Sequence, residues 1–171
     1  WFLRAYITAD EMEAAEALTG GSNDKGIDAV LIDDDTKNVF IVQGKYRENL
    51  GKKNETRNDV VGFAEVAYLL AEDEEFAAFK ESLSTEVYER LAKARRRLLK
   101  DGYRLRLFFV TTGKCSAALE KEARHIAQVQ TLPATLEVVD WQRVLSVLDY
   151  YLRDVAPPVR SPLAFLDAPD V

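Results

Sequence analysis

Two segments rich in β-branched and aromatic residues constrain the fold of this chain more than any other feature. Residues 27–34 (IDAVLIDD) and 39–46 (VFIVQGKY) are separated only by the polar segment 35–38. Short apolar runs on either side of a polar turn are typical of a β-hairpin. We therefore expect two antiparallel strands here, with the turn centred between Asp35 and Thr36.

The rest of the sequence alternates helical and strand-like patterns. Residues 103–111 and 135–139 have the composition of strands, and residues 1–7 resemble the end of a helix that begins upstream. Further helices are expected at 9–18, 58–71, 76–100, 115–128 and 140–153. Because helices separate the later strands, these strands are expected to pair in parallel within a mixed sheet. The sequence therefore predicts an α/β fold.

Length and composition are those of a globular domain. The chain has 171 residues, of which 47% are hydrophobic and 30% are charged, and this is enough to bury a core without disulfides or a structural metal. The single cysteine, Cys115, excludes an intrachain disulfide and favours a reducing, cytoplasmic setting. No apolar run approaches the roughly 20 residues of a membrane span, so no membrane partner is expected.

Both ends of the sequence suggest a piece of a longer protein. The chain begins with Trp1 rather than Met, and its end is rich in proline. We expect one domain over residues 1–155, followed by a linker or the start of the next domain at 156–171. The C-terminal domain of the parent protein would then be one partner of this chain.

Three polar side chains interrupt the apolar hairpin near one end. With the turn centred as above, Asp28 lies opposite Gln43, and Lys45 projects from the same sheet face. A carboxylate, an amide oxygen and an ammonium group would thus meet. Taken alone, an aspartate near a glycine is more often a turn residue, and a lysine at a strand end more often reaches solvent. Their shared face favours a functional site.

The order Asp28, then Gln43-Gly44-Lys45, resembles the PD-(D/E)xK nuclease motif in the QxK variant of Mrr-like restriction nucleases. The surrounding strings, SNDKGIDAV and FIVQGKYRE, are similar to the nuclease-like N-terminal region of abortive-infection phage-resistance (AIPR) proteins. The close match covers residues 20–48. The resemblance implies a restriction endonuclease-like three-layer fold, with a mixed central sheet, a β-hairpin and flanking helices.

The resemblance also implies the activity, which is divalent-metal-dependent hydrolysis of phosphodiester bonds in anti-phage defence. Asp28 would bind Mg²⁺ or Mn²⁺, together with the amide oxygen of Gln43 and the backbone carbonyl of Gly44. Lys45 would orient the attacking water or stabilise charge on the phosphate. DNA is the expected substrate, RNA remains open, and a homodimer is a further arrangement that such nucleases use to cut both strands.

The sequence departs from the nuclease motif at several positions. Ile27 stands where the motif has proline, and Gln43 removes one negative charge from the metal site. Relatives often add a glutamate on the first helix, for which Glu13 and Glu16 are the candidates unless it lies upstream of residue 1. These departures keep open a catalytically inactive module of the same fold that binds nucleic acid or docks to the rest of the defence protein. An unrelated α/β enzyme is disfavoured, because nucleophile motifs of His, Ser or Cys are missing.

The net charge of −6 argues at first against a nucleic-acid partner. However, the acidic residues are concentrated in residues 8–35, where Lys25 is the single cation. Basic residues follow the motif directly, and we expect four of them to contact the nucleic-acid backbone: Arg47, Lys52, Lys53 and Arg57. A second basic run at 90–106 is either another contact surface or a solvated helix face.

Overall fold

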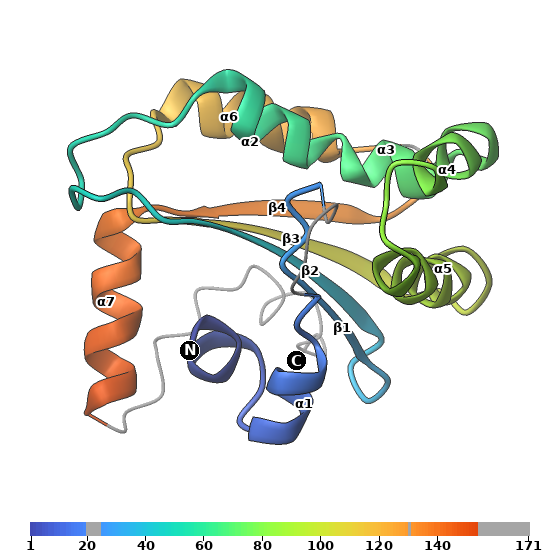
Figure 1. Cartoon of the computed structure of the whole chain (residues 1–171), viewed down its shortest axis with the longest axis horizontal. Coiled ribbons are helices and arrows are strands. Elements are labelled where there is room, and N and C mark those ends of the chain that lie inside the picture. The colour runs from blue at the N-terminus through green and yellow to red at the C-terminus, as the bar shows by residue number, and fades with distance from the viewer. Residues whose placement is uncertain (20–24, 130, 154–171) are drawn as a thin grey trace, which may run out of the picture.

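The computed structural model describes residues 1–19, 25–129 and 131–153, so the expected linker at 156–171 lies outside the described residues. Figure 1 shows a central sheet with helices above and below it. The predicted α/β class, with a mixed sheet, a hairpin and flanking helices, is confirmed.

The sheet has four strands in the order β1-β2-β3-β4: β1 (Ala29–Asp33), β2 (Asn38–Lys45), β3 (Arg104–Thr111) and β4 (Ala134–Val139). Strands β1 and β2 are antiparallel, whereas β2 with β3 and β3 with β4 are parallel. Ala29 pairs with Val42 and Asp33 with Asn38, which is the register expected for a turn centred between Asp35 and Thr36. The hairpin and the parallel crossovers are thus as predicted.

Helices cover both faces of the sheet (Figure 1). Below it in this view lie the π-helical segment η1 (Leu3–Ile7), α1 (Glu11–Glu16) and α7 (Trp141–Leu152). The other layer contains α2 (Arg57–Ala64), α3 (Val66–Ala71), α4 (Asp73–Lys80), α5 (Thr85–Lys100) and α6 (Ala117–Ala127). Among the described residues, none of these helices combines the length and the apolarity needed to cross a bilayer.

Two expected helices are each divided in the structure. The helix expected at 58–71 is interrupted only at Glu65, which keeps helical dihedrals, so α2 runs almost directly into α3. The helix expected at 76–100 is two helices, because the Ser84 hydroxyl accepts a hydrogen bond from the amide of Val87 and caps a new start. The acidic run before residue 76 forms the first turn of α4, where carboxylates interact favourably with the helix dipole.

Side-chain alternation along the strands builds two cores. Val39 and Ile41 of β2 pack in the core beneath α2–α6, which we call the upper core. Phe40 and Val42 of the same strand pack in the lower core, with η1, α1 and α7. Strand β3 is buried on both faces because it lies between β2 and β4 and under both helical layers.

Gly26 allows the chain to enter the hairpin. Its φ of +78° is unfavourable for other residues, and a Cβ here would lie 1.9 Å from Nε2 of Gln43. We predict that Gly26→Ala lowers the free energy of unfolding by about 2 kcal/mol or more, from strain and overpacking. Gly62→Ala is the matched control. Gly62 lies within α2 with open space around it, so alanine there should stabilise by about 1 kcal/mol.

Urea unfolding of the two variants and the parent chain measures both effects. Equal free energies of unfolding for Gly26→Ala and the parent chain would contradict the prediction.

Candidate nuclease site at the end of the hairpin

The predicted site residues lie at the carboxyl end of β2, next to the carboxyl end of β3. Lys45, the last residue of β2, pairs with Thr111, the last residue of β3. The segments that leave these two strands lie side by side, because the amides of Arg47 and Gly51 donate hydrogen bonds to Thr112. The carboxyl edge of parallel strands is where α/β folds commonly bind ligands.

Asp28 precedes β1 and does not continue its regular pairing. Its amide donates to the carbonyl of Val42 over 2.9 Å, although the partner of Val42 in the ladder is Ala29. Ile27 and Val30 both reach the upper core, so side-chain alternation is interrupted between them, as in a β-bulge. The direct opposition to β2 that the sequence predicted for Asp28 is therefore wrong.

The Asp28 carboxylate instead meets the edge of β2. Its Oδ2 accepts a hydrogen bond of 2.6 Å from the amide of Gly44. The carbonyl of Lys45 accepts a hydrogen bond from Thr112, so it faces β3, and neighbouring residues on a strand direct their backbone groups to opposite sides. The Gly44 carbonyl therefore points to the same side as its amide, towards the Asp28 side, beyond the end of β1.

Gln43 is 6% exposed and projects towards the upper core, on the side of Val39 and Ile41. Its amide group packs against Gly26. Within the described part of the chain, its Oε1 has no hydrogen-bond partner. A buried oxygen without a donor costs roughly 1–3 kcal/mol. Such atoms are rare in folded proteins, and a bound ion or water is one explanation for an acceptor of this kind.

Lys45 shares the sheet face of Gln43, as predicted, and reaches α2. Its Nζ lies 3.3 Å from Oδ1 of Asp59, with 31% and 28% of the two side chains exposed. Asp59 is fixed in the first turn of α2 by Thr56, whose hydroxyl accepts from the Asp59 amide and donates to Oδ2 over 2.8 Å. The ammonium group of Lys45 is thus positioned by a carboxylate that the sequence analysis did not identify.

A largely buried ion-pair network lies next to Lys45 and is joined to it through Asp59. Arg47 donates to both carboxylate oxygens of Glu55, with Nε to Oε1 at 2.9 Å, and it also reaches Asp59 at 3.1 Å. The side chain of Glu55 is completely buried and accepts a further bond of 2.6 Å from the Thr111 hydroxyl. The hydrogen bonds that Arg47 donates to Glu55 raise the pKa of Arg47, so this guanidinium remains charged.

Neither Glu55 nor Asp59 was predicted from the sequence as a site residue. The order Thr-x-x-Asp at 56–59 is a capping-box type pattern that marks the start of a helix and could have located Asp59. No comparable sequence pattern predicts that Glu55 is buried, because its buried carboxylate is satisfied in part by Thr111 from a strand distant in sequence.

The four basic residues expected to contact nucleic acid have different environments. Arg47 belongs to the buried network, and Arg57 pairs with Glu122 of α6 through an Nε–Oε1 hydrogen bond of 2.8 Å. Lys52 and Lys53 are exposed, and neither forms an ion pair with any described residue. They are the two cations of this set that remain available to a phosphate backbone.

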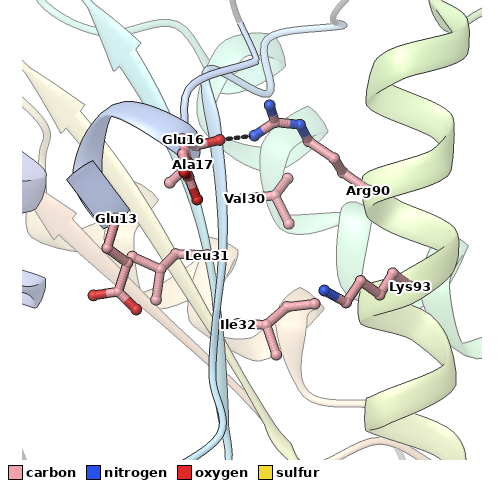
Figure 2. Close-up of a pocket in the computed structure, with 8 residues that line it drawn as sticks. All are labelled: Glu13, Glu16, Ala17, Val30, Leu31, Ile32, Arg90 and Lys93. Carbon is pink, nitrogen blue, oxygen red and sulfur yellow. Dashed lines mark hydrogen bonds between the residues drawn. The ribbon is translucent and has the colours of Figure 1, made fainter.

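The two glutamates expected as first-helix ligands line a different hollow (Figure 2). Glu13 and Glu16 line a groove of about 470 Å³ along β1 together with Arg90 and Lys93, which lie across β1 from Glu13. The backbone carbonyl of Glu16 accepts a hydrogen bond from Arg90. Asp28, Gln43 and Gly44 are not among the residues that line this groove.

Part of the second basic run is engaged within the protein. Arg95 bonds to the carbonyl of Leu70 and to Asp73, and Arg97 pairs with Asp34 and Asp101. Arg106 is buried in the sheet and donates to Thr135. This arrangement favours a structural role for these three residues. The other cations Lys93, Arg96, Lys100 and Arg104 are exposed and form no ion pair with a described residue.

The metal-ligand set contains one carboxylate. Over residues 1–19, 25–129 and 131–153, no group of three or more Asp, Glu, His or Cys side chains is placed to hold a metal ion. Asp28, the unpartnered oxygen of Gln43 and the Gly44 carbonyl are hard oxygen donors, which Mg²⁺ accepts alongside several waters. The donor chemistry therefore fits a single, weakly held divalent cation.

Comparison of the chain with protein-family models, with curated proteins and with solved structures finds no match. The interpretation of the site accordingly depends on its geometry and on the motif residues themselves.

Removal of the buried carboxylate should strongly destabilise the protein. Glu55→Ala leaves the Thr111 hydroxyl without its acceptor and Arg47 with Asp59 alone as its carboxylate partner, and we expect a loss of about 3–5 kcal/mol. Glu122→Ala, which removes the exposed partner of Arg57, should cost less than about 1 kcal/mol. Urea unfolding measures both, and similar losses in the two variants would contradict the structure.

Asp59 should make stability depend on acid pH. Burial opposes ionisation, but the Thr56 hydroxyl and the charges of Lys45 and Arg47 outweigh it and lower the pKa of Asp59. Its contribution to stability is therefore complete above the unfolded-state pKa of about 3.9 and is lost as pH falls through the lower folded-state pKa. Asp59→Asn should flatten the stability curve between about pH 5 and pH 2.

Unfolding free energies measured across this pH range test the effect. Asp149→Asn, at an exposed pair with Arg153, is the control. An Asp59→Asn curve as steep as that of the control would show that the Asp59 interactions are not formed.

Proposed function

We propose that this chain is a divalent-metal-dependent nuclease domain that hydrolyses phosphodiester bonds of nucleic acid, with DNA as the expected substrate, in anti-phage defence. The observation that carries the proposal is the buried Oε1 of Gln43, which has no hydrogen-bond donor among the described residues. It lies on the strand that Asp28 contacts and two residues before Lys45. The type of reaction is inferred from the resemblance of residues 20–48 to the QxK nuclease motif.

In this proposal the oxygens of Asp28, Gln43 and Gly44 hold one Mg²⁺ or Mn²⁺ ion. Asp28 keeps one carboxylate oxygen for this role while the other accepts from the Gly44 amide. When bound, the ion lowers the pKa of a coordinated water and offsets negative charge on the phosphate. With one carboxylate and two neutral oxygens, the site binds this ion more weakly than a site with two acids.

Lys45 would act on the attacking water or on the phosphate. An ammonium group has three hydrogens, and Asp59 accepts one of them, so two remain to face the substrate. Because Asp59 is itself fixed by Thr56, the ammonium is held in position before the substrate arrives. Fixed charges near a reacting phosphate stabilise the transition state without the cost of reorganisation.

A non-catalytic nucleic-acid-binding module is the second candidate. It is favoured by the presence of a single carboxylate among the expected ligands and by the pairing of Lys45 with Asp59. In this case Lys45 would stabilise α2, and the exposed Lys52 and Lys53 would still attract a phosphate backbone.

Plasmid nicking separates the two candidates. We expect the 171-residue chain to nick supercoiled DNA with Mg²⁺ or Mn²⁺ and to stop when EDTA removes the metal. Asp28→Asn and Lys45→Ala should each reduce the rate by about 100-fold or more. Lys93→Ala, in the groove along β1, is the matched lysine control and should cleave at the parent rate.

Equal nicking by the parent chain and Lys45→Ala would refute the catalytic assignment. Salt-dependent binding of DNA without nicking under either metal would establish the second candidate instead.

A further inference from the structure

The segment that follows Lys45 is a loop with a fixed conformation. The amide of Gly51 donates to the carbonyl of Thr112 over 2.8 Å, and Lys53 and Glu55 exchange backbone hydrogen bonds of 2.8 Å with Lys114. Gly51, with a φ of +67°, packs so closely against Trp141 that a Cβ would lie 2.7 Å from its ring. We call residues 46–53 the basic loop, and its backbone is held against the β3–α6 connection.

This rigid loop presents an aromatic ring to solvent. Tyr46 is 80% exposed, the highest value among the large hydrophobic and aromatic side chains of the described residues, and it makes no ring contact within that part of the chain. It lines a groove of about 360 Å³ together with Lys52 and Lys53. The remaining residues that line this groove are Arg47, Glu48 and Asn49.

The groove carries a net positive charge available to a ligand. The guanidinium of Arg47 is compensated by Glu55 and Asp59 behind the loop, so it adds little to the field at the surface. Lys52 and Lys53 have no ion-pair partner among the described residues, and Glu48 is the one carboxylate that lines the groove. An exposed ring and unpaired lysines in one groove are the combination that proteins use to bind nucleic-acid strands through stacking and phosphate contacts.

We propose that this groove binds an unpaired segment of the nucleic acid, with Tyr46 stacked on one base and Lys52 and Lys53 at the neighbouring phosphates. This inference rests on the proposed function in one respect, which is that the ligand is a nucleic acid. A single strand is favoured over a duplex, because the face of a base is covered by its neighbours in a helix and is free in an unstacked strand. Tyr46 directly follows Lys45 in the chain, so the groove begins at the residue next to the proposed catalytic lysine.

Binding of a fluorescein-labelled oligothymidylate of about 12 nucleotides, in EDTA, tests the proposal by fluorescence anisotropy. Tyr46→Ala should weaken binding by roughly 5- to 150-fold, the range for loss of one base–aromatic stack, whereas Tyr46→Phe should bind within about twofold of the parent chain. Tyr68→Ala, which removes another exposed tyrosine on α3, is the control and should bind like the parent chain.

The salt dependence of binding measures the contribution of Lys52 and Lys53 separately. The double variant Lys52→Ala/Lys53→Ala should reduce the slope of log K against log salt concentration by about 1.4, because each phosphate contact on a single strand contributes about 0.7. A slope equal to that of the parent chain would show that these lysines do not contact the bound strand.

The proposal is overturned if Tyr46→Ala binds the oligonucleotide as tightly as the parent chain, if the parent chain does not bind it, or if a duplex of the same length binds more tightly. These outcomes are independent of cleavage, since EDTA removes the metal. Binding that depends on Tyr46 without nicking would refute the nuclease and support this groove, and nicking with Tyr46-independent binding would do the reverse.

Discussion

The ion pair between Arg47 and Glu55 is the interaction on which this end of the molecule depends. A carboxylate that is completely buried must be paired, since its desolvation is otherwise not compensated. Arg47 comes from the loop after β2, and Thr111, which also donates to Glu55, comes from the end of β3. Arg47 in turn reaches Asp59 on α2, and Asp59 holds Lys45. One buried charge thus joins two strands, a helix and the loop that bears the candidate binding groove.

The unequal lengths of β1 and β2 create the candidate metal site. Pairing of the two strands ends at Ala29 and Val42, whereas β2 continues to Lys45. The backbone groups of Gly44 on that side are left without a strand partner, and the carboxylate of Asp28 takes the amide. The irregular pairing at Asp28 is what brings its carboxylate to this edge. A regular ladder would have placed the carboxylate on a sheet face instead.

Features set by neighbouring residues could be predicted from the sequence, and features set by distant ones could not. The register of the hairpin and the common face of Gln43 and Lys45 follow from turn length and alternation. The predicted position of Asp28 was wrong, because the hydrogen bond from its amide to Val42 interrupts the regular alternation of side chains. Glu55 was not identified because its burial requires a strand far away in sequence. The nuclease activity remains a proposal that the motif and the free oxygen of Gln43 support.

The unpartnered oxygen of Gln43 also links ligand occupancy to folding. A protein that leaves a buried acceptor unsatisfied is less stable than it could be, by an amount comparable to a hydrogen bond. Any cation that binds this oxygen in the folded state, and not in the unfolded chain, would raise the free energy of unfolding in proportion to the logarithm of its concentration. The concentration of such an ion would then set the stability of the folded domain.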